Sequence, residues 1–173
     1  MRELPPFFGK ICEINFLTPR MYRPILEAKK RQVAMEREFI MVKPNAIKRR
    51  LFGEIVSRIE GKGLKIIGLK MMRIRREQAE RQYAIHKGKP FYDGLIEYTT
   101  SGPVAAMVVE ADSAVTVTRK LIGATDPAEA LPGTIRGDFA LEVLRNVIHA
   151  SDSPENARTE YEIYFTEKDF IKY

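Results

Sequence analysis

The sequence predicts an α/β sandwich, in which one β-sheet carries helices on its faces. Three short apolar runs, at 38–43, 64–74 and 101–110, are typical of strands. Segments with helical composition lie between them, and no run of about 18 apolar residues occurs. With 173 residues, 45% of them hydrophobic, the chain can bury one core of its own.

A strand and a helix open this pattern. EFIMVK, at 38–43, is an apolar run that ends at Pro44, because proline cannot donate to a strand ladder. Leu51, Ile55 and Ile59 then recur at helical spacing, and two glycines follow them. We therefore expect one strand followed by one helix.

The middle of the chain continues the alternation. LKIIGLKMMRI, at 64–74, predicts a second strand, and two helices are expected at 77–86 and 91–100. SGPVAAMVVE, at 101–110, is nearly all apolar after its turn residues, which predicts a strand buried on both faces.

A helix and a loop follow the third strand. Residues 113–123 predict a helix, because Asp112 or Ser113 can cap its start and Gly123 can close it. Residues 124–139 contain two prolines and two glycines, which predicts a long ordered loop. Ordered loops of this length in compact domains are usually functional.

The last elements complete a known layer arrangement. Residues 138–149 predict a short helix that runs into a strand ending at His149, and Ser153 followed by Pro154 starts a helix over 154–162. The order of elements suits an α+β fold, a ferredoxin-like βαββαβ sandwich with a four-stranded antiparallel sheet and a long ordered loop before the histidine.

The N-terminal segment differs from the rest in composition. Residues 1–36 have irregular prolines and no sustained period, so we interpret them as an extension of unknown role before a domain at 37–173. Residues 1–37 carry eight Lys and Arg against four Glu, or +4 of the total +6. A basic extension on a nearly balanced domain is more typical of a solvated tail than of a surface that recognises nucleic acid.

Cysteine usage and the first residues indicate the compartment. Cys12 is the only cysteine, so neither an internal disulfide nor a cysteine-built metal site is possible. The segment MRELPPFFGK lacks the apolar stretch of a secretory signal. We expect a cytoplasmic protein that does not enter the membrane.

The stretch NVIHASDS, at 146–153, places His149 where an apolar run gives way to turn residues. Neutral imidazole attacks phosphorus near pH 7 if its other nitrogen is held in the right tautomer. Glu160, on the following helix, is the candidate holder. Guanidinium and hydroxyl groups match phosphate oxygens, which makes a phosphate clamp of Arg119, Thr125 and Arg136.

Each of these residues also has an ordinary structural explanation. A lone histidine is more often a surface residue, or a residue whose hydrogen bonds are satisfied, than a catalyst, and for His86 we prefer that interpretation. Tyr83 and Tyr92 could be packing residues. No G-x-x-x-x-G-K-[ST] loop occurs, so a P-loop enzyme is not indicated.

Taken together, six segments resemble the nucleoside diphosphate kinase family. The resemblance covers roughly residues 37–173, and the histidine signature N-x-x-H-[GA]-S-D is itself specific. In chain order the matching segments are MVKP (41–44), KPFYDGL (89–95), SGPVAAM (101–107), GATDPAEA (123–130), GTIRGDF (133–139) and NVIHASDS (146–153).

The resemblance implies transfer of a γ-phosphate from a nucleoside triphosphate to a nucleoside diphosphate by a ping-pong mechanism. His149 would carry the phosphoryl group, Glu160 would orient its ring, and Ser151 would support Glu160. Nucleotide phosphates would contact Lys43, Tyr83, Arg119, Thr125 and Arg136.

The same resemblance implies how the rest of the nucleotide is held. Asn146 and Lys43 would contact the ribose 3′-hydroxyl. Tyr92 and Val143 would sandwich the base, which gives low base specificity because stacking uses only a π-face. Mg²⁺ would arrive with the nucleotide and bridge its phosphates. Family members assemble from dimers into hexamers or tetramers, and we expect self-association here.

The sequence departs from the family pattern at named positions. Asn45 and Ala46 stand where the family has an acidic residue and a glycine, which predicts an altered turn after the lysine. Tyr92 replaces the usual phenylalanine, Leu144 stands where glycine is common, and residues 1–34 have no counterpart. The alternative to an enzyme is a family-derived binding or regulatory protein that acts through its basic extension on nucleic acid or another acidic partner. The presence of the matched catalytic positions favours the enzyme.

Overall fold

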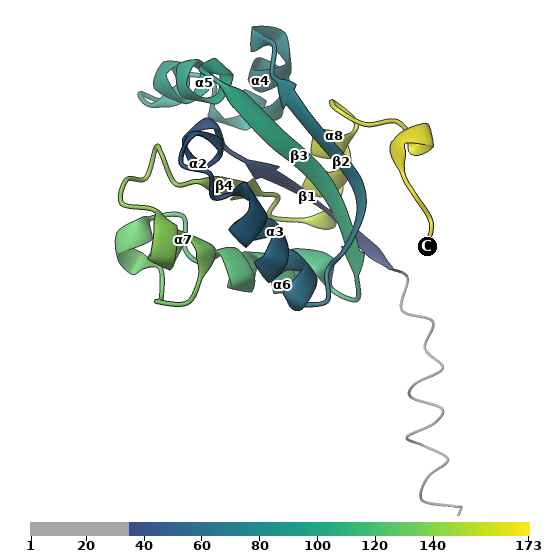
Figure 1. Cartoon of the computed structure of the whole chain (residues 1–173). Coiled ribbons are helices and arrows are strands. Elements are labelled where there is room, and N and C mark those ends of the chain that lie inside the picture. The colour runs from purple at the N-terminus through teal and green to yellow at the C-terminus, as the bar shows by residue number, and fades with distance from the viewer. Residues whose placement is uncertain (1–34) are drawn as a thin grey trace, which may run out of the picture. The chain divides into compact units, whose positions relative to one another are not determined.

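The computed structural model describes residues 35–173, so most of the predicted N-terminal extension lies outside the described residues. The described elements follow one another in Figure 1 as β1 (Glu36–Val42), α2 (Pro44–Lys48), α3 (Phe52–Gly61), β2 (Lys65–Arg73), α4 (Arg76–Gln82), the 3₁₀ turn η1 (Ala84–His86), α5 (Tyr92–Thr100), β3 (Pro103–Ala111), α6 (Ala114–Ile122), η2 (Pro127–Glu129), α7 (Ile135–Phe139), β4 (Ile148–Ala150), α8 (Pro154–Tyr161) and η3 (Glu167–Asp169).

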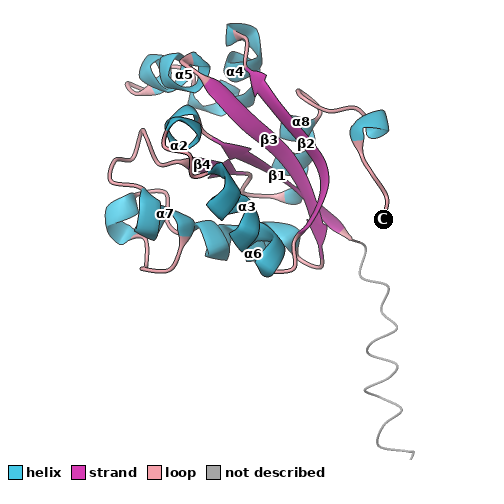
Figure 2. Cartoon of the chain, in the orientation of Figure 1, coloured by secondary structure: helices cyan, strands magenta, loops and turns pink. Residues whose placement is uncertain are grey.

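The four strands form one antiparallel sheet in the order β2-β3-β1-β4, which confirms the predicted ferredoxin-like fold (Figure 2). The central strand β1 pairs with both β3 and β4. Phe39 lies opposite Val108, and Met41 lies opposite His149. The short strand β4 is therefore fixed on the best-buried strand of the sheet.

Each face of the sheet has its own apolar cluster. Ile40 and Val42 pack with Ile55 of α3 and Ile122 of α6 on the near face in Figure 1. On the opposite face a second cluster joins Phe39 and Met41 to Ala79 of α4, Ile96 of α5 and Tyr161 of α8. The alternation of β1 side chains between the two clusters follows from the two-residue period of a strand.

Helix α2 was not predicted. The apolar run ends before Pro44 as expected, but the proline occupies the first turn of a five-residue helix, where a missing N–H costs nothing. The predicted cap of α6 is also wrong. Ser113 has a left-handed backbone and makes no side-chain cap; instead Glu36 Oε1 accepts the Val115 N–H at 3.3 Å.

The segment before the histidine is more ordered than predicted in one part and less regular in another. The expected loop at 124–139 contains η2 and α7, and Thr134 Oγ1 caps α7 by accepting the Gly137 N–H at 3.2 Å. The predicted strand at His149 forms as β4, but the helix expected directly before it is wrong, because α7 ends at Phe139 and residues 140–147 are irregular. Ser153 caps α8 as predicted, accepting the Asn156 N–H at 3.1 Å.

None of the helices at residues 35–173 combines the length and apolar character that a membrane crossing requires.

Candidate active site

The ring of His149 is held from one side by a carboxylate. Its Nε2 lies 2.5 Å from Glu160 Oε2 of α8, and Ser151 Oγ donates to the same oxygen at 3.0 Å. The histidine and glutamate side chains are 18% and 15% exposed, so the pair is shielded but reachable. Because the carboxylate engages Nε2, that nitrogen carries the ring proton and Nδ1 keeps its lone pair for chemistry.

The backbone that leads to His149 is strained and buried. Val147 has φ 61°, in the left-handed region that a β-branched residue rarely adopts. The Ile148 N–H donates to the Asn146 carbonyl at 2.7 Å, and the side chains of Val147 and Ile148 have no exposed surface. Burial of these two side chains offsets the strain and fixes the direction in which the histidine leaves the sheet.

Lys43, Asn146 and Thr125 meet at the end of β1. Lys43 Nζ donates to Asn146 Oδ1 at 2.7 Å, and Asn146 Nδ2 donates to the Thr125 carbonyl at 3.1 Å. Burial, with a smaller contribution from the charge of Arg136, lowers the pKa of the Lys43 ammonium to about 7. An ammonium in such surroundings gains strongly from an anionic ligand.

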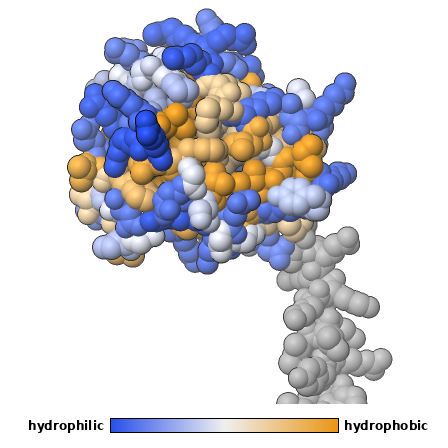
Figure 3. Space-filling model, viewed as in Figure 1, coloured by the Kyte–Doolittle hydropathy of each residue, from blue (hydrophilic) through white to orange (hydrophobic). Residues whose placement is uncertain are grey.

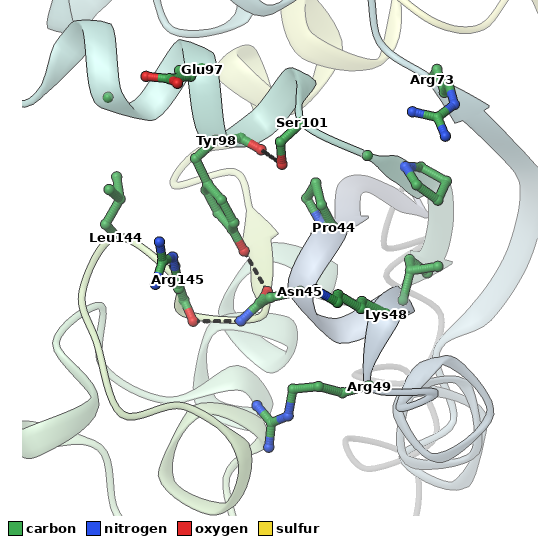
Figure 4. Close-up of a pocket in the computed structure, with 14 residues that line it drawn as sticks. Pro44, Asn45, Lys48, Arg49, Arg73, Glu97, Tyr98, Ser101, Leu144 and Arg145 are labelled. Atoms are coloured by element: carbon green, nitrogen blue, oxygen red, sulfur yellow. Dashed lines mark hydrogen bonds between the residues drawn. The ribbon is translucent and has the colours of Figure 1, made fainter.

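Asn45 anchors the turn after Lys43. Its Nδ2 donates to the Arg145 carbonyl at 2.8 Å, and the Tyr98 hydroxyl of α5 donates to its Oδ1 (Figure 4). Lys43 Nζ lies 5.8 Å from the centre of the Tyr98 ring. Asn45 therefore joins the start of α2, directly after Lys43, to α5 and to the segment before the histidine.

Two concavities lie near these residues. One of about 1060 Å³ lies between α2, α5 and the Leu144 segment (Figure 4). The other, of about 420 Å³, is lined by Arg119, Gly123 and Thr134. His149 lines neither of these two concavities.

Arg136 joins the end of α6 to β4. Its Nη1 donates to the Gly123 carbonyl at 2.8 Å and its Nη2 to the Ile148 carbonyl at 3.1 Å. Burial, and then the charge of Arg119, lower the pKa of Arg136 to about 10. The Arg119 side chain itself is exposed. The buried guanidinium of Arg136 and the exposed guanidinium of Arg119 thus place positive charge beside the backbone of β4. Guanidinium groups bind phosphate oxygens well, so this position suits a phosphate.

A row of rings runs from His149 towards α5. Tyr83 packs edge-on against His149 with ring centres 5.7 Å apart, and His86 stacks on Tyr83 at 6.4 Å. Phe91 meets His86 at 5.4 Å. The 3₁₀ turn η1 thus places the half-buried His86 ring between Tyr83 and Phe91, and the Nδ1 of His86 lies 3.1 Å from Lys89 Nζ.

Phe91 and Tyr92 differ in where their rings lie. Tyr92, the first residue of α5, packs against the apolar cluster that contains Phe39. Phe91 precedes the helix and is 49% exposed, and Val143 is 53% exposed. Of the two adjacent rings, Phe91 is the one more open to a ligand, whereas Tyr92 has the packing role that its sequence also allowed.

Comparison with known proteins agrees with this geometry. The family model described as nucleoside diphosphate kinase matches residues 36–170. The chain belongs to the nucleoside diphosphate kinase family.

Relatives in this family cover the same part of the chain. A nucleoside diphosphate kinase from Ignicoccus hospitalis is 60% identical over 138 residues, which are 80% of this chain and 94% of that protein. One from Archaeoglobus fulgidus is 55% identical over 139 residues, 80% of this chain and 92% of that protein. The solved structure of a halophilic nucleoside diphosphate kinase from Halobacterium salinarum in complex with CDP is 46% identical, with a TM-score of 0.78, and the match covers 80% of this chain and 93% of that chain.

The structure brings most of the predicted residues of this nucleoside diphosphate kinase family member into contact. One group contains His149, Glu160 and Ser151, and a second contains Lys43, Asn146 and the Thr125 backbone. Tyr83 contacts the histidine ring, and Arg136 bonds to the histidine strand. Sequence reasoning missed Phe91, although this residue stands in the matched segment KPFYDGL at 89–95.

Proposed function

We propose that the chain transfers the γ-phosphate of a nucleoside triphosphate to a nucleoside diphosphate through a phosphorylated His149. The observation that carries the proposal is the 2.5 Å contact between His149 Nε2 and Glu160, because it leaves Nδ1 as the nucleophile. Family membership supports nucleotide phosphotransfer as the reaction class.

The reaction has two matched halves. In the first, the Nδ1 lone pair of His149 forms a bond to the γ-phosphorus while the bond to the β,γ-bridging oxygen breaks, and the diphosphate leaves. In the second, a terminal oxygen of another nucleoside diphosphate attacks that phosphorus and the N–P bond breaks. In both halves Glu160 accepts a hydrogen bond from the Nε2–H of His149 and offsets the positive charge that develops on the ring.

Cationic and polar side chains would hold the phosphates and the sugar. Lys43 and Arg136 are fixed by protein acceptors, and Arg119 is free to approach from the solvent side. The contact of Lys43 with Asn146 supports their joint role at the ribose 3′-hydroxyl. Substrates that lack this hydroxyl would leave both groups without a ligand, and we expect them to react poorly.

The base would lie between Phe91 and Val143, rather than between Tyr92 and Val143. Exposure of Phe91 and packing of Tyr92 support this change from the sequence prediction. Both contact groups are apolar and ask for no base-edge hydrogen bond, which favours similar rates with all bases.

Mg²⁺ fits this site as an ion carried by the nucleotide. The described residues contain no group of three or more His, Cys, Asp or Glu side chains arranged to hold a metal. The carboxylate nearest the histidine, Glu160, is already engaged by His149 and Ser151. The ion would be held by phosphate oxygens and would neutralise charge on them, while Lys43 and the arginines orient the same phosphates.

Self-association through β2 is part of the proposal. This strand lies at the edge of the sheet, and Leu69 and Met71 are 48% and 61% exposed. Figure 3 shows hydrophobic residues gathered across the middle of the side of the molecule on which α3 and α6 lie. A strand whose outer edge is unpaired among residues 35–173, and which carries exposed apolar side chains, is suited to pairing with a second copy, as in a dimer from which hexamers or tetramers are built. Mass measurement in solution for wild type and Met71→Lys tests this, and a dimer that persists unchanged in the variant would contradict it.

Incubation of the purified chain with ATP, GDP and Mg²⁺ tests the function. GTP should form, and preincubation with ATP alone should leave acid-labile phosphate on the protein. If GTP does not appear, or appears equally with His149→Ala, the proposed function is wrong. The alternative of binding through the basic extension falls mostly on residues outside the described part, and no observation favours it.

A further inference from the structure

Glu38 is a buried carboxyl group that no step above uses. It lies on strand β1 between Arg37 and Phe39, stands opposite the buried Val109 of β3, and has no exposed surface. Its Oε2 is buried and has no hydrogen-bond partner among residues 35–173. Burial of such a group costs free energy, and strand positions of this kind ordinarily carry apolar side chains, so its presence needs an explanation.

The other oxygen of Glu38 reaches the active site. Oε1 accepts the Ser151 N–H at 2.6 Å, and the Phe39 carbonyl accepts the same N–H at 3.2 Å, as the last rung between β1 and β4. Ser151 Oγ donates to Glu160 Oε2, which is the oxygen that holds His149. One chain of contacts therefore links the buried carboxyl to the ring of the nucleophile.

The position of Ser151 explains why this contact matters. Strand β4 has only three residues, and Ser151 is the first residue after it, where the chain turns towards α8. The backbone bond to Phe39 alone is long at this point. The shorter bond from the Ser151 N–H to Glu38 holds the end of β4 in place. It also holds the first residue of the turn into α8, the helix that carries Glu160 back to His149.

The charges around Glu38 favour its neutral form. Burial raises the pKa of the Glu38 carboxyl to about 9, the Ser151 N–H bond opposes this, Glu160 and Glu36 raise it further, and Arg119 lowers it. A neutral Glu38 adds no charge to the group in which Glu160 bonds to His149. A second anion at Glu38 would weaken that arrangement by like-charge repulsion.

We propose that Glu38 is a positioning residue for phosphotransfer, which holds the Ser151 amide and thereby the point where Ser151 Oγ meets Glu160. This inference rests on the proposed function. Glu38 touches neither the nucleotide nor His149, and it acts through the two residues between them.

The test uses the full chain with Glu38→Gln and Glu38→Val, and measures both half-reactions in single turnovers. Valine suits a buried strand but removes the acceptor, so phosphorylation of His149 by ATP should slow by roughly 10-fold, as expected for a small displacement of an orienting group. The KM for nucleotides should change little, because the residues assigned to the nucleotide are untouched. The Glu38→Gln variant keeps an oxygen that accepts the Ser151 N–H, so it should phosphorylate His149 at the wild-type rate at neutral pH.

A pH profile separates positioning from a purely structural role. The wild-type rate should fall as pH rises through about 9, where Glu38 ionises, and Glu38→Gln should lack this fall. Wild-type rates per folded chain in Glu38→Val would overturn the proposal, as would a Glu38→Gln variant that is as slow as Glu38→Val. If Glu38→Val does not fold, the pH profile of Glu38→Gln tests the proposal by itself. A rate of Glu38→Gln that falls near pH 9 as the wild-type rate does would overturn the proposal. Absence of GTP formation by wild type in the same assay would instead defeat the proposed function.

Discussion

Lys43 Nζ lies 2.7 Å from Asn146 Oδ1, although the two residues are 103 positions apart in the chain. Lys43 directly follows β1, and Asn146 stands just before the strained Val147, which precedes β4. Because β1 and β4 are adjacent in the sheet, their ends bring the two side chains together. Nucleotide contacts assigned to both residues can therefore be made by one ligand.

This arrangement predicts proton uptake when a nucleotide binds. Burial lowers the pKa of Lys43 to about 7, so the cation predominates below that value in the free enzyme. A bound phosphate raises the pKa, and affinity should therefore weaken as pH rises above about 7. Calorimetry above that pH in two buffers of different ionisation enthalpy measures the uptake. Lys43→Met should abolish it and the exposed Lys120→Met should not. Wild-type binding with no proton uptake would contradict the assigned environment of Lys43.

Glu160→Gln should reduce the turnover rate while leaving the fold intact. The amide cannot offset the charge that develops on His149, so we expect kcat to fall by roughly 10- to 1,000-fold. Glu162→Gln is the matched control, because Glu162 lies just after the same helix and its carboxylate bonds to the exposed Arg158. A Glu160→Gln enzyme as fast as the control would remove Glu160 from the mechanism.

Three of the four strands were predictable because they are apolar runs with clear turn residues at their ends. Strand β4 was less predictable in extent, since it has three residues and exists through pairing with β1. Helices α2 and α7 have five residues each, too few to show a helical period. Their capping and proline signals were present, but they compete with loop interpretations of the same residues.

The sequence predicted the site residues that lie in a recognisable motif. It predicted less well the residues whose role depends on the direction in which the side chain points. Glu38 could not be found from the sequence, since nothing local shows that its carboxyl reaches the end of β4. The choice between Phe91 and Tyr92 depends on which ring lies before the first turn of α5, and a shift of one residue reverses it. Such boundaries are the least certain part of any sequence prediction.

Phe91→Ala and Tyr92→Ala should therefore differ in kind. Loss of the exposed ring should raise the KM of every nucleoside diphosphate by roughly 10-fold, since stacking contributes about 1–3 kcal/mol per base. Loss of the packed ring should lower the melting temperature with less effect on KM. Steady-state kinetics and thermal unfolding of both variants measure this. A raised KM in Tyr92→Ala alone would restore the sequence prediction.

A chain that begins at Met35 should retain phosphotransfer. The residues assigned to catalysis or nucleotide binding lie at or after Lys43, and the family match begins at residue 36. Exchange rate and mass in solution are compared with the full chain. Lost activity in a shortened chain that still folds and assembles would contradict the prediction, whereas lost assembly alone would identify the N-terminal segment as an interface element.

The central claim is that Nδ1 of His149 carries the phosphoryl group. The most direct measurement is phosphorus NMR of the ¹⁵N-histidine-labelled chain after reaction with ATP, because coupling identifies the nitrogen bonded to phosphorus. We predict one phosphohistidine, bonded through Nδ1, that is absent in His149→Ala and disappears when a nucleoside diphosphate is added. Coupling to Nε2, or a signal that persists in His149→Ala, would contradict the geometry in which Glu160 holds Nε2.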